Sequence, residues 1–456
     1  MSSPSRELPD ELVLKIISHL GTVNEIVRCS SLLSKRWRNT WRSIGGGVLE
    51  FHKSDELRCT NCKEQYRFAN LIDQALTSLA DRQNLDGLRI GFNLCGMTEE
   101  AWRWVEFGLT KRAKELTLMS YCYNWATFPL FTPEFLAGHD LSRLQILEFK
   151  GIAKIDPAAI AYILSRNCPS LRRFALRDCR FSGGETVVIR VCSSNNLEML
   201  SLEFKGQDCN VRIELSSAPS LRTFKFHGAS ASHVEFGNHL PRLREAWFGG
   251  QWILDASFCR YLPLSSFQFH MFAPRLDRLG LELGINNLRL PPPEWLLFEK
   301  LRVLDLFIHI DRCALENLFA STDLLMAAPV LHQLSIHFIN GFDSVQWESE
   351  NSSAPESSTW KHHSLEVLQL HGVHRLCASY VTPCRIQLEL AAYIITNTPS
   401  LNQVLIDTRD QCLISSSVAE YRDLDQVEGD ICEAKMEMET QLQGRSASSK
   451  IHFTYR

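Results

Sequence analysis

The 456-residue chain lacks several features that mark particular classes of protein. No stretch approaches the roughly 18 uncharged apolar residues that a membrane-spanning helix requires. The first ten residues contain no basic region followed by an apolar core, so we expect no signal peptide. Neither charge sign dominates, because 48 basic and 52 acidic side chains give a net charge of −4. This balance argues against a surface built as a whole to hold nucleic acid.

Motifs of autonomous enzymes are also missing. The chain has no phosphate-binding Gly-x-x-x-x-Gly-Lys-Ser/Thr loop, no Gly-x-Gly-x-x-Gly, no His-Glu-x-x-His and no Gly-x-Ser-x-Gly. We therefore predict no catalytic residue and no cofactor. Cys59 and Cys62 form a lone pair with His52 upstream, whereas a zinc site needs four ligands, so no metal site is predicted. The fifteen cysteines are scattered, which favours reduced core thiols in a protein of the cytoplasm or nucleus.

The chain begins with a small block of predicted helices. A first helix ends at Gly21, a second short helix is predicted over 24–29, and a third over 31–41. The first and third helices carry apolar stripes at helical spacing, Leu12-Ile16-Leu20 and Leu33-Trp37-Trp41. So few residues cannot bury these side chains among themselves, although burial of each is worth about 1.5–3 kcal/mol. We therefore expect a protein partner to cover the apolar face.

Residues 6–44 resemble an F-box. The resemblance is carried by Leu8-Pro-Asp-Glu-Leu12, Ile16-Ile-Ser-His-Leu20, Val27-Arg28, Leu33-Ser-Lys-Arg-Trp37-Arg38 and Trp41. It implies docking on a Skp-type adaptor, and through that adaptor on the cullin and RING subunit of an SCF-type ubiquitin ligase. The residues implied to form or support the docking face are Leu8, Pro9, Leu12, Ile16, Leu20, Val27 and Trp37. Gly21 departs from the proline found in many members, and the stretch from Gly21 to Leu33 is about two residues longer than usual.

Two other interpretations of this block stay open. Leu8 to Trp41 could be the first helical layer of a larger domain. Lys35-Arg36-Trp37-Arg38 could be a nuclear-import or nucleic-acid patch, although basic residues around a helix-stripe tryptophan are more often the solvated side of a helix. We predict no nucleic-acid and no membrane partner.

A second pattern, Leu-x-x-apolar-x-apolar, recurs twelve times after a connector over residues 45–84, in which a strand over 48–51 and a helix over 68–79 are predicted. The leading residues are Leu85, Ala113, Leu144, Leu171, Leu197, Leu221, Leu243, Leu276, Leu301, Leu331, Leu365 and Leu401. Proline stands two residues before the leading residue in six cases, whereas 17 prolines in 456 residues would give about 0.45 such cases by chance. Helical segments are predicted before several of these prolines, so each unit is expected to be helix, proline-bearing turn and short strand.

This repeat resembles a leucine-rich repeat array over residues 85–410, and Leu171-x-x-Phe174-x-Leu176-x-x-Cys179 matches the core of that family's repeat. The resemblance implies an α/β fold in which degenerate repeats stack into a curved solenoid, or horseshoe, behind the three-helix F-box. Insertions are predicted at 290–293 and 346–360. The remaining residues, 411–456, are predicted to be an acidic C-terminal cap or tail, either helical or unstructured.

The concave face of such a solenoid is the expected target surface, lined by the variable positions of each repeat. The candidate contact residues are Lys150, Arg173, Arg177, Lys225, His227, Trp247, Arg278 and Phe307. The cationic members predict a basic patch, and Trp247 and Phe307 are expected to be exposed aromatic anchors. Together the two parts predict a non-catalytic substrate-recognition subunit of a ubiquitin ligase that binds an unidentified protein target. The alternatives are a small-molecule co-receptor for a hormone or inositol phosphate, and a scaffold that uses the adaptor without a ligase.

Overall fold

The computed structural model describes fifteen segments of the chain. They are residues 48–52, 62–77, 79–80, 84–121, 126–182, 186–191, 195–204, 210–229, 232–250, 272–284, 298–310, 323–340, 360–371, 390–407 and 452–455. The chain divides into two compact units, Met1–Leu221 (unit 1) and Arg222–Arg456 (unit 2). The predicted F-box and its seven docking residues lie outside the described residues.

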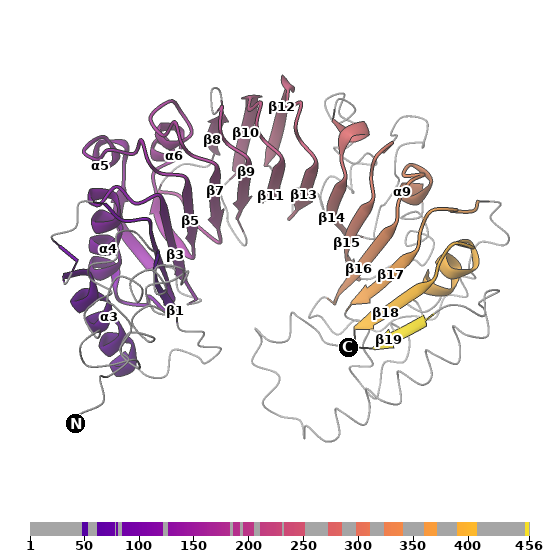
Figure 1. Cartoon of the computed structure of the whole chain (residues 1–456), viewed down its shortest axis with the longest axis horizontal. Helices are drawn as coiled ribbons and strands as arrows, with labels where there is room; N and C mark the ends of the chain where they lie inside the picture. Colours follow the sequence, from indigo (N-terminus) through magenta and orange to yellow (C-terminus); the bar gives the residue numbers. More distant parts are fainter. Residues whose placement is uncertain are drawn as a thin grey trace, which may run out of the picture. The chain divides into compact units, whose positions relative to one another are not determined.

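Unit 1 is built on parallel strands that pair in the order β1-β2-β3-β5-β7-β9 (Figure 1). The strands are β1 (Val48–His52), β2 (Gly87–Phe92), β3 (Glu115–Ser120), β5 (Ile146–Lys150), β7 (Arg173–Arg177) and β9 (Met199–Glu203). β1 comes from the predicted connector and pairs with β2, so that segment adds a strand to the sheet.

Unit 2 contains the corresponding strands in the order β11-β13-β14-β15-β16-β17-β18-β19. Their bounds are β11 (Thr223–His227), β13 (Glu245–Gly249), β14 (Arg278–Gly284), β15 (Val303–Ile310), β16 (Gln333–Asn340), β17 (Val367–His371), β18 (Gln403–Asp407) and β19 (His452–Tyr455). β19 lies in the predicted C-terminal cap or tail and was not expected as a strand. The α/β class with a large parallel sheet is confirmed, and the horseshoe curvature stays a prediction.

The twelve predicted repeats all supply a strand of these sheets. Every leading residue, from Leu85 to Leu401, is at most 4% exposed. The next template residues lie opposite one another in register: Leu88 pairs with Leu116, and in unit 2 Leu304 pairs with Leu334. A repeat cannot bury its own leucines, but parallel in-register stacking places each one beside the equivalent residue of the next repeat.

The proline signal has a structural cause. In all six cases the backbone N–H of the leading leucine donates to the carbonyl three residues earlier, with proline second in the turn, as in Cys168-Pro169-Ser170-Leu171, where the N–O distance is 3.1 Å. Proline fixes φ near the value that this turn position needs, and its missing N–H costs nothing there. At Leu365 the imidazole Nδ1 of His362 accepts the bond instead, at 3.1 Å.

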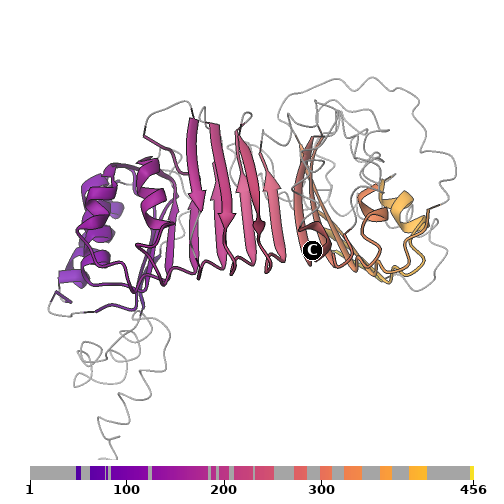
Figure 2. The same cartoon turned by 90° about the horizontal axis from the view of Figure 1, so that it is seen from above.

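The layer behind the sheet differs along the chain. In unit 1 it contains helices α3 (Cys62–Thr77), α4 (Thr98–Thr110), α5 (Pro133–Ala137) and α6 (Pro157–Ile163), which lie on one side of the strands (Figures 1 and 2). α4 packs on the leucine face, where a Cβ added to Gly108 would lie 2.9 Å from Leu116 Cδ1. In unit 2 the described helical segments are η4 (Ala273–Arg275), α9 (Asp323–Met326) and residues 390–396.

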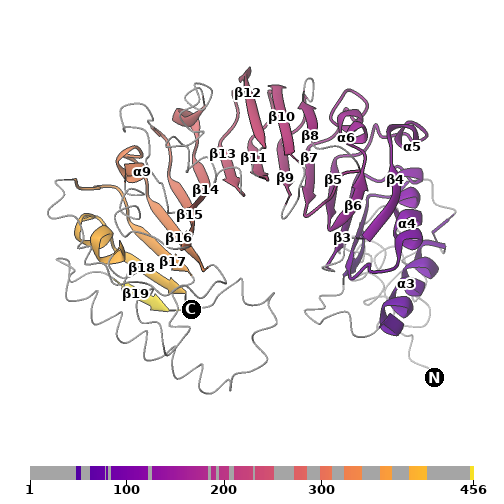
Figure 3. The same ribbon diagram turned by 180° about the vertical axis from the view of Figure 1, so that it is seen from behind.

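Not every repeat follows the predicted helix, turn and strand. β4 (Ala126–Phe131) pairs with β6 (Ile152–Ile155), and β8 (Thr186–Val191) pairs with β10 (Asn210–Ser217), in parallel ladders behind the main sheet (Figure 3). In unit 2, β12 (His233–His239) follows β11. The uniform prediction was therefore wrong for these repeats. The sequence of β8, Thr-Val-Val-Ile-Arg-Val, shows why, since alternating β-branched residues suit a strand buried on one face.

Candidate binding face

Alternation along each strand creates a second face opposite the buried leucines. In β5, Leu147 and Phe149 are buried, whereas Ile146, Glu148 and Lys150 point to the other side. We call this second side the polar face. In a five-residue strand it carries the first, third and fifth residues, and in a longer strand it carries the residues that pair with those positions of the neighbouring strand. Because the strands are parallel and in register, equivalent positions form rows across the sheet.

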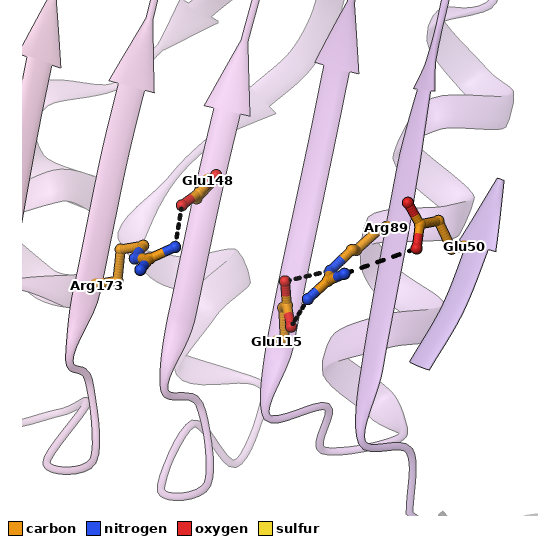
Figure 4. A network of polar contacts seen from close by, with 5 residues as sticks. All are labelled: Glu50, Arg89, Glu115, Glu148 and Arg173. Carbon is orange, nitrogen blue, oxygen red and sulfur yellow. Dashed lines mark hydrogen bonds and ion pairs between the residues drawn. The ribbon is translucent and has the colours of Figure 1, made fainter. Parts of the chain in front are cut away.

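The polar face of unit 1 carries ion pairs between neighbouring strands (Figure 4). Arg89 on β2 bonds Glu115 on β3 through two nitrogens, at 2.5 and 2.9 Å, and lies 3.6 Å from Glu50 on β1. The contact with Glu115 raises the already high pKa of Arg89. On the neighbouring strands Arg173 Nη1 lies 3.5 Å from Glu148 Oε1.

The last row of unit 1 is also occupied by mutual contacts. Arg177 Nε lies 3.6 Å from Glu203 Oε1. Lys150 Nζ lies over the Tyr121 ring, 5.5 Å from its centroid, and the Tyr121 hydroxyl is 2.9 Å from His52 Nε2. Partial burial raises the pKa of Tyr121, so this hydroxyl stays protonated at neutral pH.

These contacts correct the predicted basic patch. Lys150, Arg173 and Arg177 do lie on the polar face, but each guanidinium faces a carboxylate of a neighbouring strand and Lys150 faces an aromatic ring. The acids stand one strand away rather than in the same repeat, so a reading of single repeats overlooks them. The fourth member, Lys225, is half-buried and belongs to unit 2.

The polar face of unit 2 is aromatic at its centre. Trp247 on β13 leans over Gly280 on β14, where an added Cβ would lie only 1.9 Å from the indole Cδ1. Gly249 leaves similar space, since its added Cβ would come within 2.6 Å of indole Cη2. Glycine at both positions therefore lets the large ring lie against the backbone of the sheet.

A stack of rings continues from this tryptophan. Phe307 on β15 stands at 81° to the indole, with ring centroids 6.0 Å apart. His337 stacks on Phe307, and His371 stacks on His337, each with centroids 4.3 Å apart and nearly parallel planes. Trp247 and Phe307 are half-buried, so the prediction of exposed aromatic anchors was wrong in degree: the rings cover one another and the glycine backbone.

Two carboxylates of low exposure flank these rings. Glu282 Oε2 accepts a bond from the Gly250 backbone N–H at 2.8 Å and lies 3.2 Å from Nε2 of His227. Asp305 Oδ2 accepts from Arg278 Nε at 2.7 Å. His227 is also nearly parallel to the Trp247 ring, at 15° and 5.9 Å between centroids. The structure thus brings His227, Trp247, Arg278 and Phe307 into one neighbourhood of unit 2.

The single-repeat reading missed residues whose role depends on the next strand. Arg89, Glu115 and Tyr121 complete the polar face of unit 1, and Gly249 and Gly280 shape that of unit 2. The signal that could have found them was available: aligning the templates in register puts glycine beside tryptophan, and arginine one strand from glutamate.

Buried thiols explain part of the high cysteine content. Cys179, which ends the repeat core, is fully buried, and its Sγ lies within hydrogen-bond reach of the Arg177 and Phe149 carbonyls, at 3.3 and 3.5 Å. Burial raises the pKa of Cys179 to about 12, and likewise that of Cys168. Both are therefore core thiols rather than reactive ones.

Within the described segments, no three His, Cys, Asp or Glu side chains are grouped so that they could hold a metal ion. Cys59 lies outside those segments. Of the helices that are described, none combines the length and apolar character needed to cross a bilayer.

Parallel in-register strands built from a repeated Leu-x-x-apolar-x-apolar unit define a leucine-rich repeat protein. Residues 98–442 match the family model described as At1g61320/AtMIF1, LRR domain, and residues 6–46 match that of the F-box domain. The chain belongs to the At1g61320/AtMIF1 leucine-rich repeat family and is an F-box/leucine-rich repeat protein of the plant type.

Similar proteins come from Arabidopsis thaliana. The chain is 29% identical over 226 residues to F-box/FBD/LRR-repeat protein At5g56420, an alignment that covers 49% of each chain. It is 23% identical over 425 residues to putative F-box/FBD/LRR-repeat protein At3g49030, covering 88% of this chain and 87% of that protein. Putative FBD-associated F-box protein At5g56400 is 24% identical over 426 residues, covering 88% and 85%. The chain thus matches about half the length of the first of these relatives and most of the other two.

Proposed function

We propose that the chain is a substrate-recognition subunit of an SCF-type ubiquitin ligase. F-box domains generally bind Skp-type adaptors, and F-box/leucine-rich repeat proteins are generally non-catalytic, so the family suggests an adaptor role. In the proposal, the F-box docks on the Skp-type adaptor and the polar face of the repeats holds a protein target. The ligase then acts on a target lysine by proximity.

One observation carries this proposal: the match to an F-box at residues 6–46 is joined to a repeat array that presents a continuous row of varied side chains in each unit. The ion pairs of unit 1 favour a protein target over a small polyanion. A phosphate would have to displace Glu148 and Glu203 from Arg173 and Arg177, whereas a protein surface can match both signs of charge.

The test is co-purification of the full chain with a Skp-type adaptor and its cullin. Trp37→Ala combined with Ile16→Ala should weaken adaptor binding more than about 100-fold, because two large apolar anchors of a docking interface each contribute about 2 kcal/mol or more. Trp247→Ala, which changes an aromatic residue of the array, is the matched control and should leave adaptor binding unchanged.

Retention of the adaptor by the double variant would refute the docking assignment. Recovery of the adaptor without cullin would refute the ligase role and favour a scaffold that uses the adaptor alone. Binding of an inositol phosphate or plant hormone to the complex, measured as a thermal shift abolished by Arg173→Ala, would replace the protein-target proposal by the co-receptor one.

A further inference from the structure

The polar face of unit 2 contains a corner made of two aromatic rings. The Trp247 indole forms its floor, because it lies over Gly280 and Gly249 rather than standing upright. The Phe307 ring forms its wall, at 81° to the floor with centroids 6.0 Å apart. We call these two rings the aromatic corner. Both side chains are half-buried, so part of each ring remains accessible.

The corner is held in place from behind. His337 stacks on the Phe307 ring and His371 stacks on His337, with ring centroids 4.3 Å apart in each pair. The strands β15, β16 and β17 that carry these three rings are paired in register. Glycine at 280 leaves the space that the floor needs, since any larger residue there would collide with the indole. A site whose rings are already ordered loses less conformational entropy when a partner binds.

The charge around the corner is negative. The described polar-face residues of β11, β13, β14 and β15 include three carboxylates, Glu245, Glu282 and Asp305, against two cations, Arg278 and the Lys225 ammonium that is the register neighbour of Trp247. Glu282 and Asp305 are each 8% exposed, and they are the register neighbours of Phe307 and Gly280, so they flank both the wall and the floor. Carboxylates of such low exposure are screened little by salt.

We propose that the aromatic corner binds an arginine or lysine side chain from a basic segment of the target protein, an inference that rests on the proposed function of the array as a target-binding surface. The indole face attracts a cation, and tryptophan is the strongest such partner. A planar guanidinium can stack on the floor while its edge N–H groups point toward Glu282 and Asp305. Aromatic anchors beside buried acids are the arrangement expected for a basic partner.

The probe is a library of random peptides displayed on phage, selected on the purified full chain in complex with its Skp-type adaptor. Selected peptides are then synthesised with a fluorescent label, and their affinity is measured by anisotropy. The inference predicts peptides enriched in arginine or lysine. It also predicts affinity about tenfold weaker for Trp247→Ala, the loss expected for a partly desolvated cation–π contact.

Two further variants separate this contact from a general loss of structure. Gly280→Ala removes none of the side chains proposed to contact the peptide. Its methyl group displaces the Trp247 indole from its position over residue 280, so this variant should weaken binding of the same peptides. Glu282→Gln keeps an oxygen to accept the Gly250 N–H bond and removes one charge of low exposure, so it should weaken the basic peptides by a similar factor at low and at high salt. Tyr66→Ala on helix α3 of unit 1, which removes a ring of a residue that is 51% exposed and lies outside the polar face, is the matched control and should have no effect.

Basic peptides that bind Trp247→Ala and Gly280→Ala as tightly as the unaltered chain would overturn the inference, because they would bind elsewhere. Selection of acidic or purely apolar peptides, or of no peptide at all, would overturn it as well. The outcome is independent of the docking test: adaptor binding with no peptide selected refutes only this inference. If the adaptor does not bind, the selection is repeated on the full chain alone, and the proposed ligase role fails by itself.

Discussion

The two units share a core pattern and differ in the faces that surround it. Both bury apolar residues at equivalent positions of the repeat strands, such as Phe174 in unit 1 and Phe224 in unit 2. On the polar face, unit 1 carries cross-strand ion pairs, whereas unit 2 carries a run of aromatic and imidazole rings. The core residues must fit a neighbouring copy of themselves, while the polar residues face no such copy. The array can therefore present different chemistry on one scaffold.

The largest expected effect would test whether the two cores are equivalent. Phe174→Ala and Phe224→Ala each remove a ring that is at most 1% exposed, so each should lower the free energy of unfolding of its unit by about 3–5 kcal/mol. The free energy of unfolding is measured by urea denaturation, monitored by amide hydrogen exchange so that each unit is observed separately.

Matched controls lie directly after the leading leucines. Arg172 and Arg222 are exposed at equivalent positions, and their replacement by alanine should change stability by no more than about 0.5 kcal/mol. A loss below about 1 kcal/mol for either phenylalanine variant would show that the two cores are not equivalent.

An effect of intermediate size is expected at a single turn of unit 2 that differs from its counterparts in unit 1. His362 is buried in unit 2; its Nδ1 accepts from the Leu365 N–H and its Nε2 is 2.9 Å from the Ala328 carbonyl. Burial lowers the pKa of His362 below its ordinary value of 6.5. Between the pKa of His362 in the folded chain and its ordinary value of 6.5, the unfolded chain binds more protons than the folded chain. The contribution of the neutral imidazole to the free energy of unfolding is therefore complete above about pH 6.5 and is lost as the pH falls through the folded pKa. Loss of the buried acceptor is worth about 1–3 kcal/mol.

The measurement is hydrogen exchange of residues 360–371 between pH 7.5 and 5, corrected for intrinsic rates. Acid should open this turn, whereas the Leu171 turn of unit 1, closed by a backbone carbonyl, should be unaffected. His362→Asn keeps an acceptor without the titration and should remove the pH dependence, while His363→Asn at the exposed neighbouring position should not. A pH dependence that survives His362→Asn would refute this assignment.

The smallest expected effect concerns the faces themselves. Arg89 is 41% exposed, so Arg89→Met should cost less than about 1 kcal/mol at low salt and almost nothing at 1 M salt. Phe307→Leu in unit 2 should have an effect that does not change with salt, because ring contacts are not screened. Thermal unfolding at several salt concentrations measures both, and equal salt dependence would contradict the distinction between the two faces.

Much of the fold was predictable because it depends on short-range patterns. Leu-x-x-apolar-x-apolar predicted all twelve repeat strands, and the six prolines predicted turns that the structure closes with one backbone hydrogen bond each. The back layer was predicted less well. Helix and strand both bury an apolar stripe behind the sheet, and the β-branched alternation of β8 was needed to decide between them.

The candidate binding face was predicted as a set of positions rather than as chemistry. All eight proposed contact residues lie on the polar face, but whether they contact a target stays a prediction. Their local environment could not be read from single repeats: Arg173 meets an acid from the preceding strand, and Trp247 needs glycine from the following one.

The repeat, its register and the identity of the buried residues could be read from the amino-acid order, because they depend on spacing along one chain. Which side chains meet across neighbouring strands depends on the folded array. Register partners on neighbouring repeat strands are 22 to 36 positions apart along the chain but lie about 5 Å apart in the sheet. A change of a few residues in one connecting loop leaves this lateral pairing intact. Ion pairs in unit 1 and the aromatic corner in unit 2 are both products of this lateral contact.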